Sequence, residues 1–466
     1  MYLFINFTGS KTRCFVLLFV ILAAGLMNPL RGQEQSELEL AIVEMSTNHP
    51  AVRSEALRLS ARLKAASFAS RAYPDPSIEF STQHSSGDET MWNPDFAVRR
   101  MFRDAREFRI SQPIPFPGRL TLGARIADLE AEAQRLQLGI EKNELIEQFL
   151  SALVEIKTLK EILAVTGEIS EKMRIMSDAA RARYAAGEGS LADVSRANLR
   201  RQSYLQRMSE IESMAAERTR ELDYFVFHTE EMPEHALHHP SAVIRLVEKP
   251  RELTAYLDRI RQKASDSSMS LEDQSLEIAL AKIQENRQEN EKSLAKMNYL
   301  PDFELFAGYR REDFHTSDFS RIFRENFVTA GVSIRLPLWS GLSNHLQVES
   351  RDNDLRAARA SSENILRRHH AEFYAVRERI LSDRQRIEIY STGLVPQAEQ
   401  ARDSSFLAYQ AGRVDFSTVL ESWDNLYMQK TEKIRLEGDA ARRVLMLAKI
   451  LNILIPETQN EKPENE

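Results

Sequence analysis

Charged and aromatic side chains gather around a glycine at two places in this 466-residue chain. One stretch, Tyr409 to Asp424, reads YQAGRVDFSTVLESWD, and the other, Tyr184 to Asn198, reads YAAGEGSLADVSRAN. Both contain the pattern Tyr-x-Ala-Gly, at an offset of 225 residues. Acids, an arginine and a tyrosine so close together can form ion pairs and charge-assisted hydrogen bonds where the fold brings them into contact.

The glycines indicate how the backbone runs at these stretches. A glycine after a helical run lets a helix end in the left-handed conformation, and Asp415 or Ser417 can cap the helix that follows. We therefore predict that each stretch is a hairpin tip between two antiparallel helices. On the residues alone, Asp193 and Asp415 could serve only as helix caps, and Tyr409 could serve only in packing between helices.

Nothing in the chain points to enzymatic chemistry, so we expect no catalytic residues, no cofactor and no metal. Paired carboxylates, a nucleophile triad and a phosphate-binding loop do not stand out. His369 and His370 are neighbours on a predicted helix, so they point about 100° apart and do not chelate one metal together. A histidine-rich loop can bind a metal, but a solvated surface loop is the simpler interpretation. The histidines concerned are His228, His235, His238 and His239.

Composition and the N-terminus narrow the class of protein. The formal charge of −7 gives no basic surface for nucleic acid, and only 16 Gly and 16 Pro are typical of long helices. Lys11 and Arg13 precede an apolar run that ends at Met27, so we predict a secretory signal peptide over 1–32. The run is short for a membrane helix of about 20 residues, although an uncleaved anchor is the alternative. Cys14 is the only cysteine, which excludes disulfides and Cys-ligated zinc in the mature chain.

Four segments alternate between apolar and polar residues and are predicted to be strands, at about 77–83, 106–114, 302–311 and 327–337. The second and fourth end in proline-containing exits. These exits read QPIPFPG at Gln112–Gly118 and LPLWSG at Leu336–Gly341.

Long helices follow each pair of strands. No proline occurs from Gly118 to Glu231, and the apolar residues after Arg119 follow a heptad pattern. A helix from Arg119 to Ala186 would be about 100 Å long, with a return helix at about 190–225. The second half repeats this arrangement from about Leu342 to Ala411, where Pro396 should kink or divide the helix, and then to about 453.

Landmarks of the two halves recur at nearly constant offsets, 225 residues for Pro76 and Pro301 and 222 for Pro115 and Pro337. This regularity predicts an internal duplication. The resulting division is a signal peptide (1–32), a first repeat (33–228), an equatorial-type insert (229–270), a second repeat (271–455) and a disordered tail (456–466).

Four strands with one apolar face cannot close a barrel alone. A barrel that spans lipid needs about eight or more strands, so a membrane location would require an oligomer whose chains share one barrel. A water-soluble four-stranded sheet is the alternative. The signal peptide and the apolar face of the fourth strand favour the shared barrel.

Over essentially its whole mature length the chain resembles the TolC family of outer-membrane efflux and export channels. The resemblance is carried by the two strand exits, the two tips and the duplicated order of elements. It implies a mainly α fold with a small β part, in which a trimeric α-barrel tunnel continues into a shared 12-stranded β-barrel. It also implies a homotrimer in outer-membrane lipid, with a periplasmic adaptor protein and an inner-membrane transporter as partners and no nucleic acid.

The resemblance further implies a periplasmic aperture at the tips, formed by Asp193, Tyr409, Arg413, Asp415 and Glu421. In a trimer each acid would appear three times around one axis, and such rings hold cations and can gate. Two departures from the family pattern are visible. Arg413 follows Gly412 directly, where the family arginine commonly sits two residues after the glycine, and Thr418 stands where an acid is often found. The expected function is a passive exit duct for a tripartite efflux pump or secretion system; the alternative is a periplasmic coiled-coil scaffold or adaptor without a pore.

Overall fold

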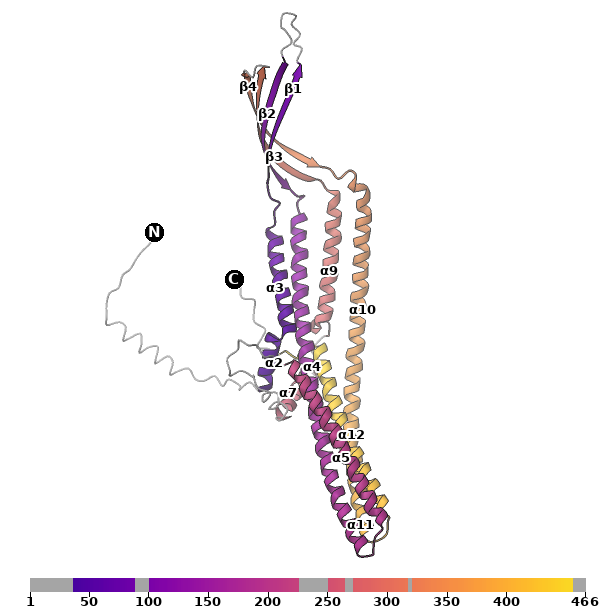
Figure 1. The fold of residues 1–466 in the computed structure, drawn as a ribbon. Helices are drawn as coiled ribbons and strands as arrows, with labels where there is room; N and C mark the ends of the chain where they lie inside the picture. Colours follow the sequence, from indigo (N-terminus) through magenta and orange to yellow (C-terminus); the bar gives the residue numbers. More distant parts are fainter. Residues whose placement is uncertain (1–36, 89–99, 226–249, 265–270, 317–320, 456–466) are drawn as a thin grey trace, which may run out of the picture.

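The computed structural model describes residues 37–88, 100–225, 250–264, 271–316 and 321–455. It shows a long column of helices with a four-stranded sheet at one end and two helical hairpins at the other (Figure 1). The predicted mainly helical fold with a small antiparallel sheet is confirmed. The expected signal peptide, the histidine cluster and the tail lie outside the described residues, and of the insert only 250–264 is described.

The first half of the chain contains one uninterrupted helix of 67 residues, as the absence of proline predicted. Its elements are α2 (Glu37–Asn48), α3 (Pro50–Arg71), β1 (Ser77–Asp88), β2 (Arg100–Ile114), α4 (Arg119–Ala185), α5 (Leu191–Glu221) and the short turn η1 (Leu222–Tyr224).

The second half repeats the order of two strands, long helix, tip and return helix. Its elements are α7 (Pro250–Ala264), α8 (Leu271–Gln274), α9 (Leu276–Lys296), η2 (Met297–Tyr299), β3 (Asp302–Thr316), β4 (Arg321–Arg335), α10 (Ser340–Ile389), η3 (Tyr390–Leu394), α11 (Val395–Gln410) and α12 (Phe416–Ile450). The element η3 is a single π-helical turn directly ahead of Pro396. Since proline has no N–H, it cannot continue the regular hydrogen-bond ladder, and the second long helix is divided there as predicted.

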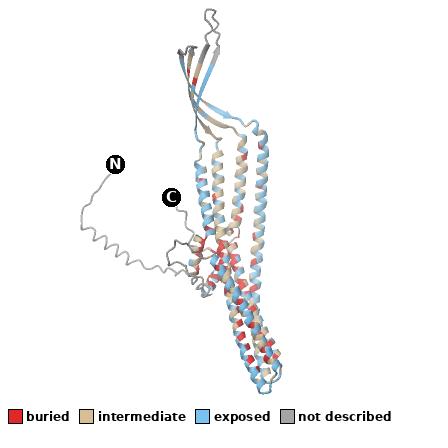
Figure 2. Ribbon diagram, viewed as in Figure 1, coloured by how far each residue is buried: buried red, intermediate tan, exposed pale blue. Residues whose placement is uncertain are grey.

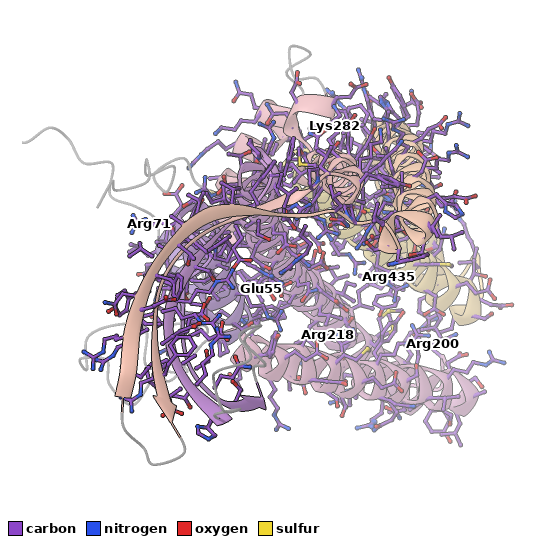
Figure 3. The ribbon with its side chains drawn as sticks, turned by 90° about the horizontal axis from the view of Figure 1, so that it is seen from above. Glu55, Arg71, Arg200, Arg218, Lys282 and Arg435 are labelled. Carbon is purple, nitrogen blue, oxygen red and sulfur yellow. The ribbon has the colours of Figure 1, made fainter. Side chains whose placement is uncertain are left out.

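The four strands pair antiparallel in the order β1-β2-β3-β4, so β2 and β3 join the two halves. Phe80, Phe108, Tyr309 and Val328 lie at one level across the sheet. The strands extend beyond the predicted segments at the end away from the helices, where charged residues on both faces hide the alternation. The sheet curves away from the helical column in the view down the long axis (Figure 3).

Burial is concentrated in the middle of the column and in the lower hairpins (Figure 2). The middle cluster includes Ile42, Ile146, Phe149 and Leu445. A separate cluster in the hairpins includes Tyr204. Around the upper helices many large apolar side chains are exposed, among them Phe68, Leu342 and Leu346. A single chain therefore leaves extended apolar surface on its upper helices uncovered.

Candidate aperture at the hairpin tips and the two-faced sheet

The two tips have the same backbone construction. Gly187 and Gly412 both have positive φ, 78° and 69°, and each lies beyond the last turn of a long helix. The next residue in each case bonds back across the turn, with Glu188 N donating to Arg183 O at 2.9 Å and Arg413 N donating to Ala408 O at 2.8 Å. This pattern of bonds closes a helix with a glycine in the left-handed region, which is the termination expected from the sequence.

Neither aspartate of the tips caps its helix through its side chain. Ser190 is the N-cap of α5, and its Oγ accepts from Ala192 N at 3.0 Å. Asp193 lies in the first turn, with its Oδ1 3.6 Å from the guanidinium of Arg196. Asp415 occupies the N-cap position of α12 but makes no side-chain capping bond, and it is exposed. Asp415 is therefore the N-cap residue by position, but the prediction that its carboxylate caps the helix is wrong.

Tyr409 packs between the two hairpins. Its ring lies 5.2 Å from the ring of Phe416, and the guanidinium of Arg183 sits 4.8 Å above it. Because Arg183 belongs to α4 and Tyr409 to α11, the tyrosine joins the first hairpin to the second. Tyr409 is half-buried, so the packing interpretation holds within one chain.

The five predicted aperture residues do not form a cluster of ion pairs within one chain. Arg413, Asp415 and Glu421 are exposed, and Asp193 and Tyr409 are half-buried. In the described part of the chain, no ion pair joins any two of them. The charges of the second tip thus remain at the surface of the single chain.

A buried clasp between the hairpins was not predicted from the sequence. Tyr204 of α5 is 0% exposed, and its hydroxyl donates to Asp424 Oδ1 of α12 at 2.7 Å. The guanidinium of Arg200 lies 2.8 Å from the other carboxylate oxygen of Asp424. Burial raises the pKa of Tyr204, and its hydrogen bond to Asp424 raises it further. The Tyr204 ring also meets Tyr427 edge-on at 5.1 Å, and Arg207 stacks over both rings.

A second polar contact is buried midway along the column. The side chain of His369 on α10 is 5% exposed, and its Nε2 lies 2.6 Å from Glu277 Oε2 in the first turn of α9. This hydrogen bond lowers the pKa of the Glu277 carboxyl. His369 is therefore a structural partner of a carboxylate, and in the described residues no group of three or more His, Cys, Asp or Glu could hold a metal.

The two faces of the sheet differ in chemistry and in burial. Exposed apolar side chains cover one face: Ile78, Phe80, Phe108, Ile110, Leu305, Tyr309, Val328, Val332 and Ile334. On the opposite face Glu312 is only 4% exposed, with Arg310 at 2.7 Å and Arg103 also paired to it. There too, Arg109 stacks 4.3 Å over Phe306. The sheet is curved (Figure 3), and the greater burial on the polar face indicates that this face is concave and the apolar face convex.

The apolar face continues to the junction between the sheet and the helices. Leu336, Leu338 and Trp339 follow β4 and are strongly exposed, with Trp339 at 84%. Over the described residues, no helix is both long enough and apolar enough to cross a membrane.

Comparison with known proteins identifies the fold. Residues 41–222 match the sequence profile of the family described as outer membrane efflux protein. The match lies in the first half of the chain. The resemblance to TolC-family channels that the strand exits and tips indicated is thereby confirmed, and solved channels extend it as a fold over both halves.

Three solved outer-membrane proteins show how far the efflux-protein fold extends. VceC from Vibrio cholerae superposes with a TM-score of 0.68 at 18% identity, covering 89% of this chain and 96% of VceC. The CmeC outer membrane channel of Campylobacter jejuni gives 0.65 at 11% identity, covering 91% and 87%. The open state of the Neisseria gonorrhoeae MtrE outer membrane channel gives 0.63 at 12% identity, covering 90% and 89%. Among curated proteins, none matches the chain by sequence.

Proposed function

We propose that this protein is an outer-membrane channel and acts as the passive exit duct of a tripartite efflux pump or secretion system. The observation that carries this proposal is the sheet, which has an exposed apolar convex face and a charged concave face. A membrane-spanning sheet needs an apolar surface toward lipid and a polar surface toward an aqueous interior. The match to the efflux-protein family supports the same conclusion.

The dimensions of the apolar face suit a membrane. On β3 it runs from Phe303 to Arg311, where charged residues begin. Eight residues of strand span about 26 Å, which becomes roughly 20 Å of height at a tilt of about 40° and approaches the apolar band of about 25 Å in outer-membrane proteins. Trp339 at the lower margin suits the interface between lipid and water, where aromatic side chains concentrate.

The strand count supports an oligomer. Four strands leave both edges of the sheet open, and three chains together would supply twelve strands for one closed barrel. The exposed apolar side chains on the upper helices support the same homotrimer, since neighbouring chains would cover them. A periplasmic adaptor and an inner-membrane transporter are then the expected partners at the helical end, with no enzymatic activity in the duct itself.

The aperture is proposed at the tips. Asp415 and Glu421 have exposed carboxylates, and Asp193 is half-buried beside Arg196. Three copies of each around one axis would repel one another and attract cations. Tyr409 and Arg413 complete the proposed aperture, with Tyr409 bracing the second hairpin against Arg183 of the first.

A periplasmic scaffold without a pore is the competing function, and one set of measurements separates the two. We expect a trimer in detergent that conducts ions in planar bilayers, and a monomeric soluble product would contradict the proposal. Changing Asp193, Asp415 and Glu421 together to Ala should raise the resting conductance and weaken block by divalent cations. Control changes of exposed acids on α10, Glu378→Ala and Glu388→Ala, should leave both unchanged.

A further inference from the structure

The convex face of the sheet changes from apolar to charged above the apolar band, with three arginines and two aspartates among the described residues. Arg106, Arg311 and Asn326 lie opposite one another on β2, β3 and β4. Each is two residues beyond an apolar residue of the band, so each points to the same face. Arg324 lies one step further along the same face of β4, opposite Asp313. Three arginines thus form a row across three strands, which we name the arginine row (Arg106, Arg311 and Arg324).

The charges of the arginine row are only partly neutralised. Arg311 and Arg324 both bind the carboxylate of Asp313, through Nε at 3.1 Å and 2.8 Å. Both bonds use Nε, and the terminal guanidinium nitrogens of Arg311 and Arg324 show no hydrogen bond to the described residues. Arg106 is exposed and forms no ion pair in that part of the chain. On this face and at this height, three guanidiniums stand against the carboxylates of Asp313 and Asp104, the latter paired with His84.

We propose that the arginine row binds the phosphates of a bisphosphorylated glycolipid in the membrane leaflet distal to the helices. The inference rests on the proposed function, because only a membrane-spanning apolar band brings the row to the level of the headgroups. The sheet end that carries the row points away from the helical column (Figure 1), so the leaflet concerned is the one on the far side from the periplasm.

Guanidinium chemistry favours a phosphate partner. Arginine presents planar pairs of donors that match phosphate oxygens, and it is less strongly hydrated than lysine. Adjacent strands are about 4.8 Å apart, so the row spans roughly 10 Å across β2 to β4. Arg311 and Arg324 already converge on one carboxylate, and Arg106 lies on the next strand. A headgroup with two phosphates can therefore engage this pair and Arg106 separately. The hydroxyl of Thr82 and the amide of Asn326 flank the row on the same face and add hydrogen-bonding groups.

Lipid binding to the purified trimer tests the proposal. Native mass spectrometry would count bound bacterial lipid A, a bisphosphorylated glycolipid, and bound phosphatidylglycerol in separate titrations. Each arginine near an anionic surface is worth roughly a fivefold change in affinity, so changing all three to Gln should weaken lipid A binding about a hundredfold. The control Arg335→Gln removes an exposed arginine from the opposite face of β4 and should change lipid A binding less than twofold.

Single and conservative variants keep the test decisive if the triple variant fails to assemble. Arg106→Gln breaks no ion pair among the described residues, and it should weaken lipid A binding about fivefold. Unchanged lipid A affinity in Arg106→Gln or in the triple variant would overturn the proposal. Equal affinity for phosphatidylglycerol and lipid A in the wild type would also overturn the assignment to a glycolipid. A wild-type trimer that conducts but binds no lipid A refutes this inference alone, whereas a chain that neither trimerises nor conducts refutes the proposed function.

Discussion

The change Tyr204→Phe should weaken the clasp between the two hairpins without disturbing the packing of the ring. The Tyr204 hydroxyl donates to a carboxylate at 2.7 Å, and hydrogen bonds to charged groups contribute about 1.5–3 kcal/mol. Asp424 keeps its contact with Arg200, and its side chain is 29% exposed, so water can replace part of the lost bond. We therefore expect the free energy of unfolding to fall by about 1–2 kcal/mol.

A double-mutant cycle measures the clasp directly. Tyr204→Phe, Asp424→Asn and the double variant would be unfolded thermally in detergent and followed by circular dichroism. The two residues should show a coupling free energy of about 1 kcal/mol. Tyr427→Phe is the matched control, because among the described residues the Tyr427 hydroxyl bonds only to Thr166, at 3.3 Å. It should cost about 0.5 kcal/mol or less.

The pH dependence of the clasp gives an independent check. The pKa of Tyr204 is raised in the folded protein, so its contribution is complete below its ordinary pKa of 10.0 and is lost as the pH rises above that value. Tyr204→Phe should flatten the fall in stability above pH 10. A wild-type stability that is insensitive to the substitution at neutral pH, together with no coupling to Asp424, would refute the clasp.

Three further changes test other parts of the column. Gly438→Ala should destabilise the protein by about 1–2 kcal/mol, because a Cβ there would lie 2.3 Å from Thr158 Oγ1, and Thr158→Ala should restore most of the loss in thermal unfolding. The carboxyl of Glu277 has a lowered pKa, so its bond to His369 stabilises the fold at pH values above 4.5, the ordinary pKa of this group, and this stabilisation is lost as the pH falls below that value. Glu277→Gln should therefore reduce the loss of stability at acid pH. An unchanged dependence of stability on pH in this variant would contradict the prediction. Ser190→Ala should lower the free energy of unfolding by about 1 kcal/mol, because the helix α5 loses its N-cap bond. An unchanged free energy of unfolding would show that this bond does not stabilise the helix in solution.

Local features of the backbone could be predicted from the sequence. The absence of proline after Gly118 predicted the long helix, and Pro396 predicted its division in the second half. Gly187 and Gly412 predicted the left-handed ends of the two tips. Each of these features depends on the backbone conformations that proline or glycine allows.

Contacts between distant segments could not be predicted in the same way. Tyr204 and Asp424 are 220 residues apart, and their bond depends on the packing of α5 against α12. The strand β2 begins at Arg100, earlier than the predicted start at about 106. The alternation of apolar and polar residues could not reveal this part of the strand, because Arg103 and Asp104 place charges on both faces of the sheet. The sequence could predict that Asp415 occupies the N-cap position of α12, but it could not predict the direction in which the Asp415 carboxylate points.

The π turn η3 records a difference in length between the halves. Pro115 and Tyr184 are 69 residues apart, whereas Pro337 and Tyr409 are 72 residues apart. Three extra residues would lengthen an α-helix by about 4.5 Å and rotate everything beyond them by roughly 60°. A wider turn takes up part of that excess at one point, so the tip of the second hairpin can stay level with the first. An insertion during divergence of the two repeats could thus have been tolerated without disturbing either end of the column.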